Sequence, residues 1–348
     1  MTREIISTAL DAAEQAPWSV AEDGEELEQA PERRSFGVAA DEHGLRIDKL
    51  LATRCPEFSR SYFQQLLDDG AVTLGGRVVT KASAKVKAGE AVAVELRPTA
   101  QAQAFLPQEM ALRVIHEDEH LLVIDKPAGL VVHPAAGNWT GTLLNGLLAY
   151  HAGAARLPRA GIVHRLDKDT SGLMLVGKTQ QACEALVRLI AARQVHRIYV
   201  ALAHGGWRGE DEVLVDRAIG RDPRNRLRMA VLGEGSSGAK TAQTSVRLLD
   251  QGRDYCWVGC KLHTGRTHQI RVHMAWLGHP LVGDATYGGR AQAGMQRQAL
   301  HAHRLALRHP ITGQELQFEC PLPPDLAGAV KEAGLRYNLD HLWRVQVA

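Results

Sequence analysis

The sequence has few cysteines and no long apolar run. Its 348 residues contain five cysteines, too few for a disulfide framework in a chain of this length. No apolar run approaches the roughly 18 to 20 residues that a membrane-spanning helix needs. The N-terminal segment lacks the basic start and apolar core of a signal peptide. We therefore expect a cytoplasmic protein without a membrane segment.

The order of the predicted elements lacks a strict strand–helix–strand alternation. Glycine-rich nucleotide-binding loops of the P-loop or dinucleotide type occur in that alternation. The sequence also contains no Gly-x-Ser-x-Gly elbow, the motif that places a nucleophilic serine above a sheet. These absences argue against chemistry driven by NTPs or NAD and against a serine hydrolase.

Acidic residues are concentrated at the N-terminus. The net charge is +2 overall, but nine acidic residues and one basic residue lie among the first 32. The rest of the chain therefore holds 40 of the 41 basic residues and 30 of the 39 acidic ones, a net charge of +10. A basic body with an acidic tail fits a protein that binds a polyanion, and a solvated surface explains the charge equally well.

The chain is too long for one ordinary core, and its pattern divides into four segments. Residues 1–40 are acidic and are expected to form a disordered extension. Residues 41–97 predict a small α+β unit, with Ser59 as the N-cap of its second helix. Residues 98–110 indicate a linker. Residues 111–345 predict a larger α+β domain on a mixed, largely antiparallel sheet.

The larger domain is expected to contain more strands than helices, with hairpin-like spacing between strands. Strands are predicted at residues 112–118, 120–126, 161–166, 172–178, 197–205, 242–249 and 254–263. Helices are predicted at residues 142–151, 181–194 and 268–278, the second of them capped by Thr179.

Residues 161–178 comprise two predicted strands and the polar turn between them, and reactive side chains are concentrated in that turn. It contains His164, Arg165, Asp167, Lys168, Asp169, Thr170 and Ser171. Reactive groups on a loop between rigid strands are a common geometry of functional sites. The same residue types also make an ordinary charged turn.

Residues 261–273 predict the end of a strand and a helix capped by Thr267. Arg266 would stand just before the helix N-terminus, where free N–H groups favour anions such as phosphate. Histidines in this segment suggest a metal site, but a five-residue spacing turns about 140° around a helix, so His268 and His273 diverge. We therefore expect no metal here.

An arginine-rich segment lies at residues 216–228, where proline and glycine interrupt the pattern. Its arginines are Arg217, Arg221, Arg224, Arg226 and Arg228. An arginine-rich loop suits contact with phosphate groups. A solvated surface loop is the equal alternative.

Several of these segments together resemble one family. The matching segments are residues 125–134, 164–173, 197–201, 264–271, 279–288 and 298–302. In this order they resemble the motifs of the pseudouridine synthases that modify large-subunit ribosomal RNA. Residues 41–97 resemble an S4 RNA-binding domain. The resemblance implies an α+β pseudouridine synthase fold preceded by a small S4 domain.

The resemblance also implies a catalytic set. Asp167 would be the nucleophile, which attacks the sugar or assists loss of the base. Arg266 would pair with Asp167 and keep it ionised, and Tyr199 would stack on the base and take a sugar proton. Apolar contact with the base would come from Leu173 and Ile270. The reaction is an isomerisation and needs no cofactor.

RNA is the partner that the resemblance implies. Arg165 would fill the gap that a flipped uridine leaves in its helix. Other RNA contacts are expected from Arg46, Lys49, Ser59 and Arg60 in the small unit and from Arg221, Arg224 and Arg226 in the arginine-rich segment. The expected target is 23S ribosomal RNA or a precursor of the large subunit, at the helix 69 stem-loop, bound by a monomer.

Three other functions remain open at this point. A synthase of the same family can act on tRNA. An RNA-binding ribosome assembly factor can keep the fold without catalysis. A glycosidase would need a second carboxylate, such as that of Asp169.

Overall fold

The computed structural model describes residues 32–97, 102–135, 137–225, 227–233 and 235–343. They form two compact units, which divide between Thr99 and Ala100. Each unit is described by itself. Within the described ranges, no helix is long and apolar enough to cross a membrane.

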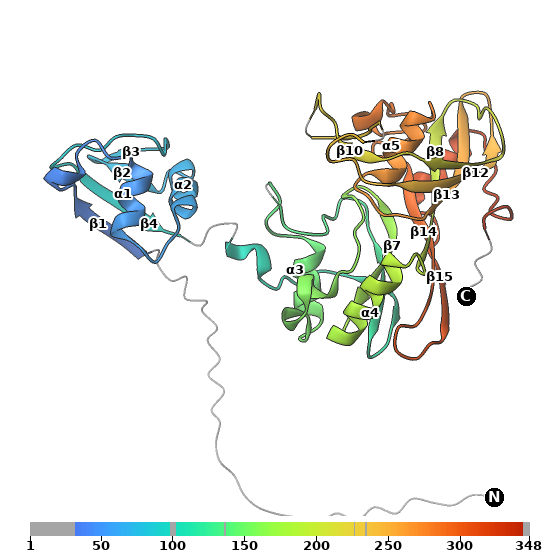
Figure 1. Ribbon diagram of the computed structural model, residues 1–348, viewed down its shortest axis with the longest axis horizontal. Coiled ribbons are helices and arrows are strands. Elements are labelled where there is room, and N and C mark those ends of the chain that lie inside the picture. Colours follow the sequence, from blue (N-terminus) through green and yellow to red (C-terminus); the bar gives the residue numbers. More distant parts are fainter. Residues whose placement is uncertain (1–31, 98–101, 136, 226, 234, 344–348) are drawn as a thin grey trace, which may run out of the picture. The chain divides into compact units, whose positions relative to one another are not determined.

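The small unit is a four-stranded antiparallel sheet with two helices (Figure 1). In spatial order its strands are β1 (Glu32–Gly37), β4 (Ala91–Leu96), β2 (Val72–Leu74) and β3 (Arg77–Val78), and its helices are α1 (Ile47–Arg54) and α2 (Arg60–Asp68). Ile47, Leu50 and Leu51 recur at helical spacing and are fully buried. Ser59 caps α2 by accepting a hydrogen bond from Tyr62 N at 3.2 Å, as its sequence predicts.

Strand β1 corrects the prediction that the extension is disordered as far as residue 40. It pairs with β4 along its whole length, from Glu32 opposite Leu96 to Gly37 opposite Ala91. Its side chains are exposed or only half-buried, so it lacks the alternating apolar pattern by which a strand is predicted. Residues 38–40 are also described, and residues 1–31 of the predicted extension lie outside the described residues.

The large unit is built on a mixed nine-stranded sheet, antiparallel except where β7 runs parallel to β14. Its strands, in spatial order, are β5 (Arg113–Glu117), β6 (Leu121–Lys126), β7 (Ser171–Gly177), β14 (Leu300–Arg308), β8 (His196–His204), β13 (Tyr255–Leu262), β12 (Gln243–Gln251) and β9 (Glu212–Asp216), with β15 (Glu315–Glu319) paired to β14. A separate hairpin joins β10 (Ile219–Arg221) and β11 (Met229–Val231). The predicted α+β class is confirmed.

Helices pack on both faces of this sheet. They are α3 (Leu143–Tyr150), α4 (Gln180–Ala191), α5 (Gln269–Trp276) and α6 (Pro324–Glu332), with short 3-10 turns at Ala102–Phe105, Ala154–Arg156, Pro158–Gly161 and Ala285–Tyr287. Because side chains alternate along a strand, β8 contributes to two cores. Tyr199 packs in the core that contains α3 and α5, whereas Ile198 packs in the core that contains α6.

The strand predicted at residues 161–166 does not form. Ile162 alone makes a β-bridge, to Val176. Gly161 has a φ of +84°, and a Cβ there would stand 2.0 Å from a backbone oxygen, so glycine is required. The partly buried ring of His164 accepts the N–H of Leu175 through Nε2 at 2.9 Å, in place of a strand partner. Residues 161–166 therefore form an irregular segment that leads into the loop before β7.

Candidate active site

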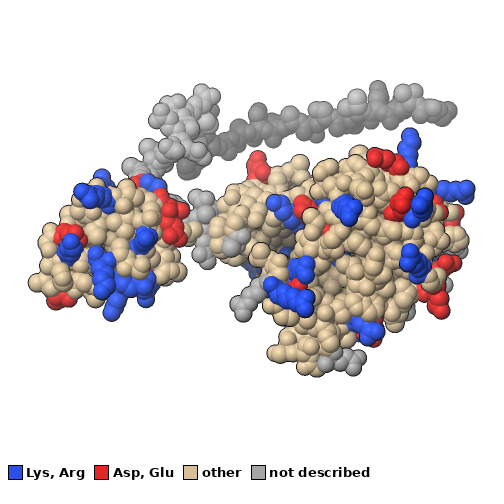
Figure 2. All heavy atoms as spheres, turned by 90° about the horizontal axis from the view of Figure 1, so that it is seen from above, with Lys and Arg blue, Asp and Glu red and all other residues tan. Residues whose placement is uncertain are grey.

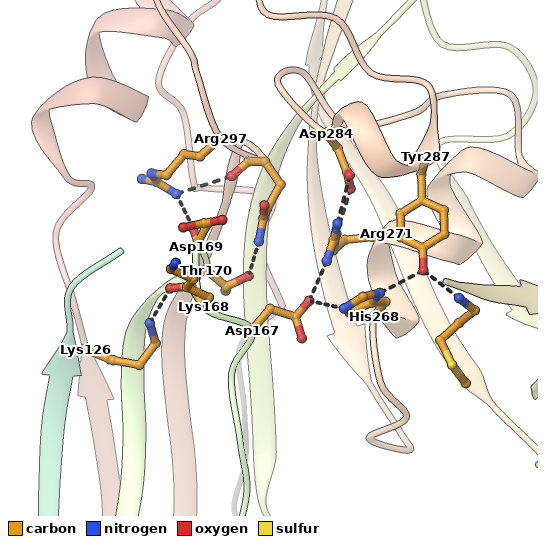
Figure 3. A network of polar contacts seen from close by, with 12 residues as sticks. Lys126, Asp167, Lys168, Asp169, Thr170, His268, Arg271, Asp284, Tyr287 and Arg297 are labelled. Carbon is orange, nitrogen blue, oxygen red and sulfur yellow. Dashed lines mark hydrogen bonds and ion pairs between the residues drawn. The ribbon is translucent and has the colours of Figure 1, made fainter. Parts of the chain in front are cut away.

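The loop that carries Asp167 is anchored by a buried lysine (Figure 3). Lys126, at the end of β6, is fully buried, and its Nζ donates to three backbone carbonyl oxygens, that of Lys168 among them at 2.9 Å. Burial lowers the pKa of Lys126 to about 8, against the opposing charges of Asp169 and Asp167. These contacts hold the loop backbone one residue beyond Asp167.

The other side of the loop is held by the residues just before β14. Arg297 Nη1 donates to Asp169 O at 2.9 Å, and Gln298 Nε2 donates to Thr170 Oγ1 at 3.3 Å. Arg297 is itself fixed by an ion pair with Asp325, whose Oδ2 lies 2.8 Å from Nε. Anchors on both sides leave the Asp167 side chain in a defined position.

The carboxylate of Asp167 pairs with Arg271 of α5 (Figure 3). Arg271 Nη1 lies 3.1 Å from Asp167 Oδ2, and its Nε and Nη2 donate to the two oxygens of buried Asp284 at 2.7 and 2.9 Å. Burial by itself lowers the pKa of Arg271, but hydrogen bonds to Asp284 and the charges of both carboxylates raise it above its ordinary value. A permanent cation therefore stands beside Asp167.

This geometry corrects the prediction that Arg266 pairs with Asp167. Arg266 is exposed, and its Nε donates to Thr241 O at 3.0 Å. The predicted cap, Thr267, is also wrong, because the N-cap is His268 in the left-handed region, at a φ of 57°. Arg266 and Asp167 line the same cleft, but Arg271, in the first turn of α5, is the arginine that pairs with Asp167.

A histidine and a tyrosine complete the polar surroundings of Asp167. His268 Nε2 lies 3.9 Å from Asp167 Oδ2, and its Nδ1 lies 2.8 Å from the hydroxyl of Tyr287. That hydroxyl accepts the N–H of Met229 at 3.0 Å, so its proton is available to His268 Nδ1. Burial lowers the pKa of His268. A neutral ring accepts the Tyr287 proton on Nδ1 and carries its own proton on Nε2, which faces Asp167 at a distance beyond a direct hydrogen bond.

Asp167, His268 and Arg271 line a cleft of about 400 Å³. Its apolar lining includes Tyr199 and Ile270, both buried, together with Leu166 and Leu300. Burial raises the pKa of Tyr199 to about 12, so its hydroxyl keeps its proton at neutral pH. Arg165 lines the cleft and is exposed. The structure thus places Arg165, Asp167, Tyr199 and Ile270 in one cleft.

Leu173 lies elsewhere, which corrects its predicted contact with the base. It is 2% exposed and packs with Ala182 and Leu186 of α4. The next residue along β7, Met174, belongs instead to the core that contains Tyr199. Leu173 therefore faces away from the cleft, because alternate residues of a strand point to opposite faces of its sheet.

Arginine dominates the charge of the cleft. Among the described residues that line it, Asp167 is the only acidic one. The arginines of the lining are Arg165, Arg193, Arg197, Arg266 and Arg271. An excess of positive charge around a single carboxylate favours a polyanionic ligand.

The arginine-rich segment forms the β10–β11 hairpin, whose second strand supplies the Met229 N–H to Tyr287. Arg221 ends β10 and Arg224 is exposed in the turn, where Asp222 Oδ1 accepts the N–H of Arg224 at 2.9 Å. Arg226 lies outside the described residues. The hairpin is therefore joined to the network around Asp167 by its backbone.

In the small unit two of the predicted RNA-contacting residues, Arg46 and Arg60, share one buried aspartate. Arg46 and Arg60 both bond Asp48 Oδ2, at 3.0 and 2.9 Å, while about half of each side chain stays exposed. Lys49 is exposed. Ser59 is engaged as the cap of α2. Figure 2 shows Lys and Arg side chains gathered on one side of this unit, as on a surface that binds a polyanion.

Five residues of the site are missing from the sequence-based set. They are Lys126, His268, Arg271, Asp284 and Tyr287. All of them lie inside the segments that carry the family resemblance, so a signal was present. Their roles depend on which direction each side chain takes, and motif spacing does not supply that direction.

Comparisons with known proteins agree on one family. The family model for RNA pseudouridylate synthase matches residues 120–276, and the model for the S4 domain matches residues 45–92. The "Ribosomal large subunit pseudouridine synthase D" of Neisseria meningitidis serogroup B is 45% identical over 308 residues, which cover 85% of this chain and 81% of that protein. The "Uncharacterized RNA pseudouridine synthase YlyB" of Bacillus subtilis is 44% identical, over 86% of this chain and 97% of that protein.

Solved structures agree with this result. "Human RNA Pseudouridylate Synthase Domain Containing 1" is 29% identical with a TM-score of 0.51, over 63% of this chain and 87% of that chain. "Human RNA Pseudouridylate Synthase Domain Containing 4" has a TM-score of 0.52 over 64% of this chain and 94% of that chain, and its 24% identity supports the fold alone.

Proposed function

The chain belongs to the RNA pseudouridylate synthase family, and from that premise we propose that it converts uridine to pseudouridine in 23S ribosomal RNA, with Asp167 as the nucleophile. The names of its bacterial relatives, which specify the large ribosomal subunit, support this substrate. The observation that carries the proposal is the pair of Asp167 and Arg271, 3.1 Å apart in a cleft lined by arginines.

The proposed reaction rearranges the bonds of one nucleotide. The N1–C1′ bond of uridine breaks, the base turns, and a C5–C1′ bond forms. The hydrogen on C5 leaves as a proton, and N1 gains one. Because no electrons are gained or lost overall, side chains that stabilise charge and move protons are sufficient and no cofactor is required.

Asp167 suits attack on C1′ or stabilisation of the charge there. Its Oδ2 faces Arg271 and His268, whereas Oδ1 accepts no hydrogen bond from any described residue (Figure 3). Oδ1 is therefore the atom we assign to the sugar carbon, as a carboxylate acts in retaining glycosidases. Asp284 holds the guanidinium of Arg271 from its other side, which keeps the cation in place as Asp167 reacts.

The apolar side of the cleft suits a uracil ring. Tyr199 presents an aromatic face, and Ile270 adds aliphatic contact. With a pKa raised to about 12, the Tyr199 hydroxyl holds its own proton in the ground state, so to take a sugar proton it must first pass its own to another group. A base must leave its RNA helix to reach the apolar side of the cleft. Exposed Arg165 is suitably placed to occupy the gap that the base leaves in the RNA helix.

RNA outside the target nucleotide would be bound by positive surfaces. Exposed Lys49 and half-exposed Arg46 and Arg60 of the S4 domain suit phosphate contact. Arg221 and Arg224 of the β10–β11 hairpin suit the same role close to the cleft. For the target we propose the helix 69 stem-loop of the large subunit, a hairpin of the kind that such surfaces read by shape.

The test is to map pseudouridine in all RNA from cells that lack the gene. We expect helix 69 sites to lose pseudouridine, and a plasmid copy of the wild-type gene to restore them. Loss at other 23S sites would change the target but keep the substrate class. Loss only in tRNA, or an unchanged pattern, would contradict the proposal.

A further inference from the structure

One buried guanidinium in the cleft has no counter-ion. Arg197 lies on β8, two residues before Tyr199, and faces the same cleft. It is 7% exposed, yet its Nε has no hydrogen-bond partner. No other described residue forms an ion pair with it. Burial lowers the pKa of Arg197, in keeping with the lack of an acidic neighbour. Arg271, by contrast, is equally buried and has two carboxylates.

An unpaired buried charge is expensive, so its presence requires an explanation. Removing a charged group from water costs several kcal/mol unless a partner compensates for it. The backbone of Arg197 is fixed, because β8 is central in the sheet and pairs at this residue with Leu262 of β13 and Leu305 of β14. A shift of the strand therefore cannot carry the guanidinium into water. A partner that arrives from outside the protein would provide the missing compensation.

The loop before α5 is shaped around this guanidinium. A Cβ at Gly265 would stand 2.9 Å from Arg197 Nη1, closer than real Cβ contacts allow. Gly265 does not have the positive φ that makes glycine necessary in many turns. A side chain at position 265 would press on the end of the Arg197 side chain, so this loop lies close against the guanidinium.

The chemistry around Arg197 selects an anion. The lining near it adds Arg193, whose Nη1 is bound to Gln243 Oε1 at 2.9 Å, and His263, whose Nε2 lies 2.9 Å from Ser245 Oγ. A planar guanidinium with unused donors fits two oxygens of a phosphate. Arg197 and Tyr199 stand about 6.6 Å apart along the strand and on one face of it, so the anion and the Tyr199 ring would share one side of the sheet.

We propose that Arg197 binds one of the two phosphates that flank the target uridine and so positions that nucleotide between Tyr199 and Asp167. The inference rests on the proposed function, because it places the target uridine in this cleft. It assigns to Arg197 the recognition of the RNA backbone inside the active site, separate from the S4 domain and from the β10–β11 hairpin.

The test combines a protein change with an RNA change. Arg197→Met keeps the volume and removes the charge, and Arg253→Met makes the same change at an exposed arginine outside the cleft. The RNA is a synthetic helix 69 stem-loop, unmodified or with one neutral methylphosphonate at the 5′ or the 3′ phosphate of the target uridine. The readouts are kcat/KM for pseudouridine formation and the thermal unfolding midpoint of each full-length protein.

We expect Arg197→Met to lower kcat/KM on unmodified RNA by about 10- to 100-fold, the loss of one charged hydrogen-bonding contact. One of the methylphosphonates should lower the wild-type kcat/KM to a similar extent. When Arg197→Met is combined with that methylphosphonate, kcat/KM should fall by less than about threefold beyond the effect of either change alone. The unfolding midpoint of Arg197→Met should equal or exceed that of wild type, because an apolar residue replaces an unpaired buried charge. Arg253→Met should behave as wild type.

The proposal is overturned if neither methylphosphonate affects the wild-type enzyme, or if the protein and RNA effects multiply. A fall in the unfolding midpoint of Arg197→Met without a fall in kcat/KM assigns Arg197 to structure instead. If the wild-type protein converts no uridine in this stem-loop or in ribosomal RNA, the proposed function fails. If conversion proceeds and only the dependence on the flanking phosphate is missing, the proposed function stands and the role of Arg197 fails.

Discussion

Arg271 bonds Asp167 with Nη1 at 3.1 Å from the first turn of a helix that starts at Gln269, three residues after the arginine predicted for this role. The rest of its guanidinium is bound to Asp284. Because one planar group joins two carboxylates, the position of Asp167 depends on a residue from a different loop. The contributions of these residues to catalysis and to stability can therefore be tested separately.

Replacing Arg271 by lysine should reduce kcat/KM by at least about 100-fold, because an ammonium group cannot bridge both carboxylates in the geometry of a guanidinium fork. The change should also lower the free energy of unfolding by about 3 kcal/mol, since Asp284 is left buried without its two hydrogen bonds. Steady-state kinetics and urea unfolding measure these effects. Arg266→Lys is the matched comparison and should cost less than about tenfold in kcat/KM. Equal losses in the two variants would contradict the assignment.

Replacing Leu173 by alanine should affect stability and leave catalysis largely intact. Leu173 is 2% exposed in the core beneath α4, so the free energy of unfolding should fall by about 2 to 5 kcal/mol. The kcat/KM of the folded enzyme should change by less than about threefold. Ile270→Ala, at the cleft, should lower kcat/KM by roughly tenfold. A tenfold loss of kcat/KM in Leu173→Ala, at a temperature where the variant is fully folded, would show that Leu173 does contribute to the site.

Acid should destabilise the protein partly through His164. Burial, with a smaller contribution from the charge of Arg197, lowers the pKa of His164 to about 3, whereas an unfolded histidine titrates near 6.5. Between these values the unfolded chain binds a proton that the folded one does not, so stability is present above pH 6.5 and is lost as the pH falls toward 3. From pH 7 to pH 5 this one group should cost about 2 kcal/mol. Urea unfolding of His164→Gln, which can still accept the N–H of Leu175, should show a pH dependence smaller by that amount. An unchanged dependence would contradict the prediction.

Lys49 should contribute to RNA affinity and not to chemistry. It is exposed on the S4 domain, so Lys49→Gln should weaken binding of the stem-loop and reduce the slope of log affinity against log salt by about one. The maximal rate at saturating RNA should remain that of wild type. A salt series of equilibrium binding measurements checks the slope, and an unaltered slope would remove Lys49 from the interface.

Local signals in the sequence predict much of this fold. Ser59 and Thr179 are recognisable caps, and both accept the expected backbone N–H. Buried helix faces follow from the spacing of Ile47, Leu50 and Leu51. Strand β1 escapes prediction because its pairing with β4 depends on backbone bonds and not on an apolar pattern.

The errors within the site have a common physical origin. Motif spacing identifies the segments of Arg266, Arg271 and Leu173, but the direction of each side chain is set elsewhere. The left-handed His268 decides where α5 begins, and with it which arginine reaches Asp167. The start of β7 decides which face Leu173 takes, because a shift of one residue reverses every side chain of a strand.

The central claim, that Asp167 attacks or stabilises the sugar of a uridine, is tested most directly by release of tritium from RNA labelled at uridine C5. Formation of pseudouridine expels that hydrogen to water, so the count follows the chemistry without a coupled assay. Asp167→Asn should lower the rate by at least about 10³-fold. Asp169→Asn, two residues away in the same loop, should stay within a few-fold of wild type. If Asp167→Asn releases tritium at a rate near that of the wild-type protein, Asp167 is not the nucleophile and this account of the site is wrong.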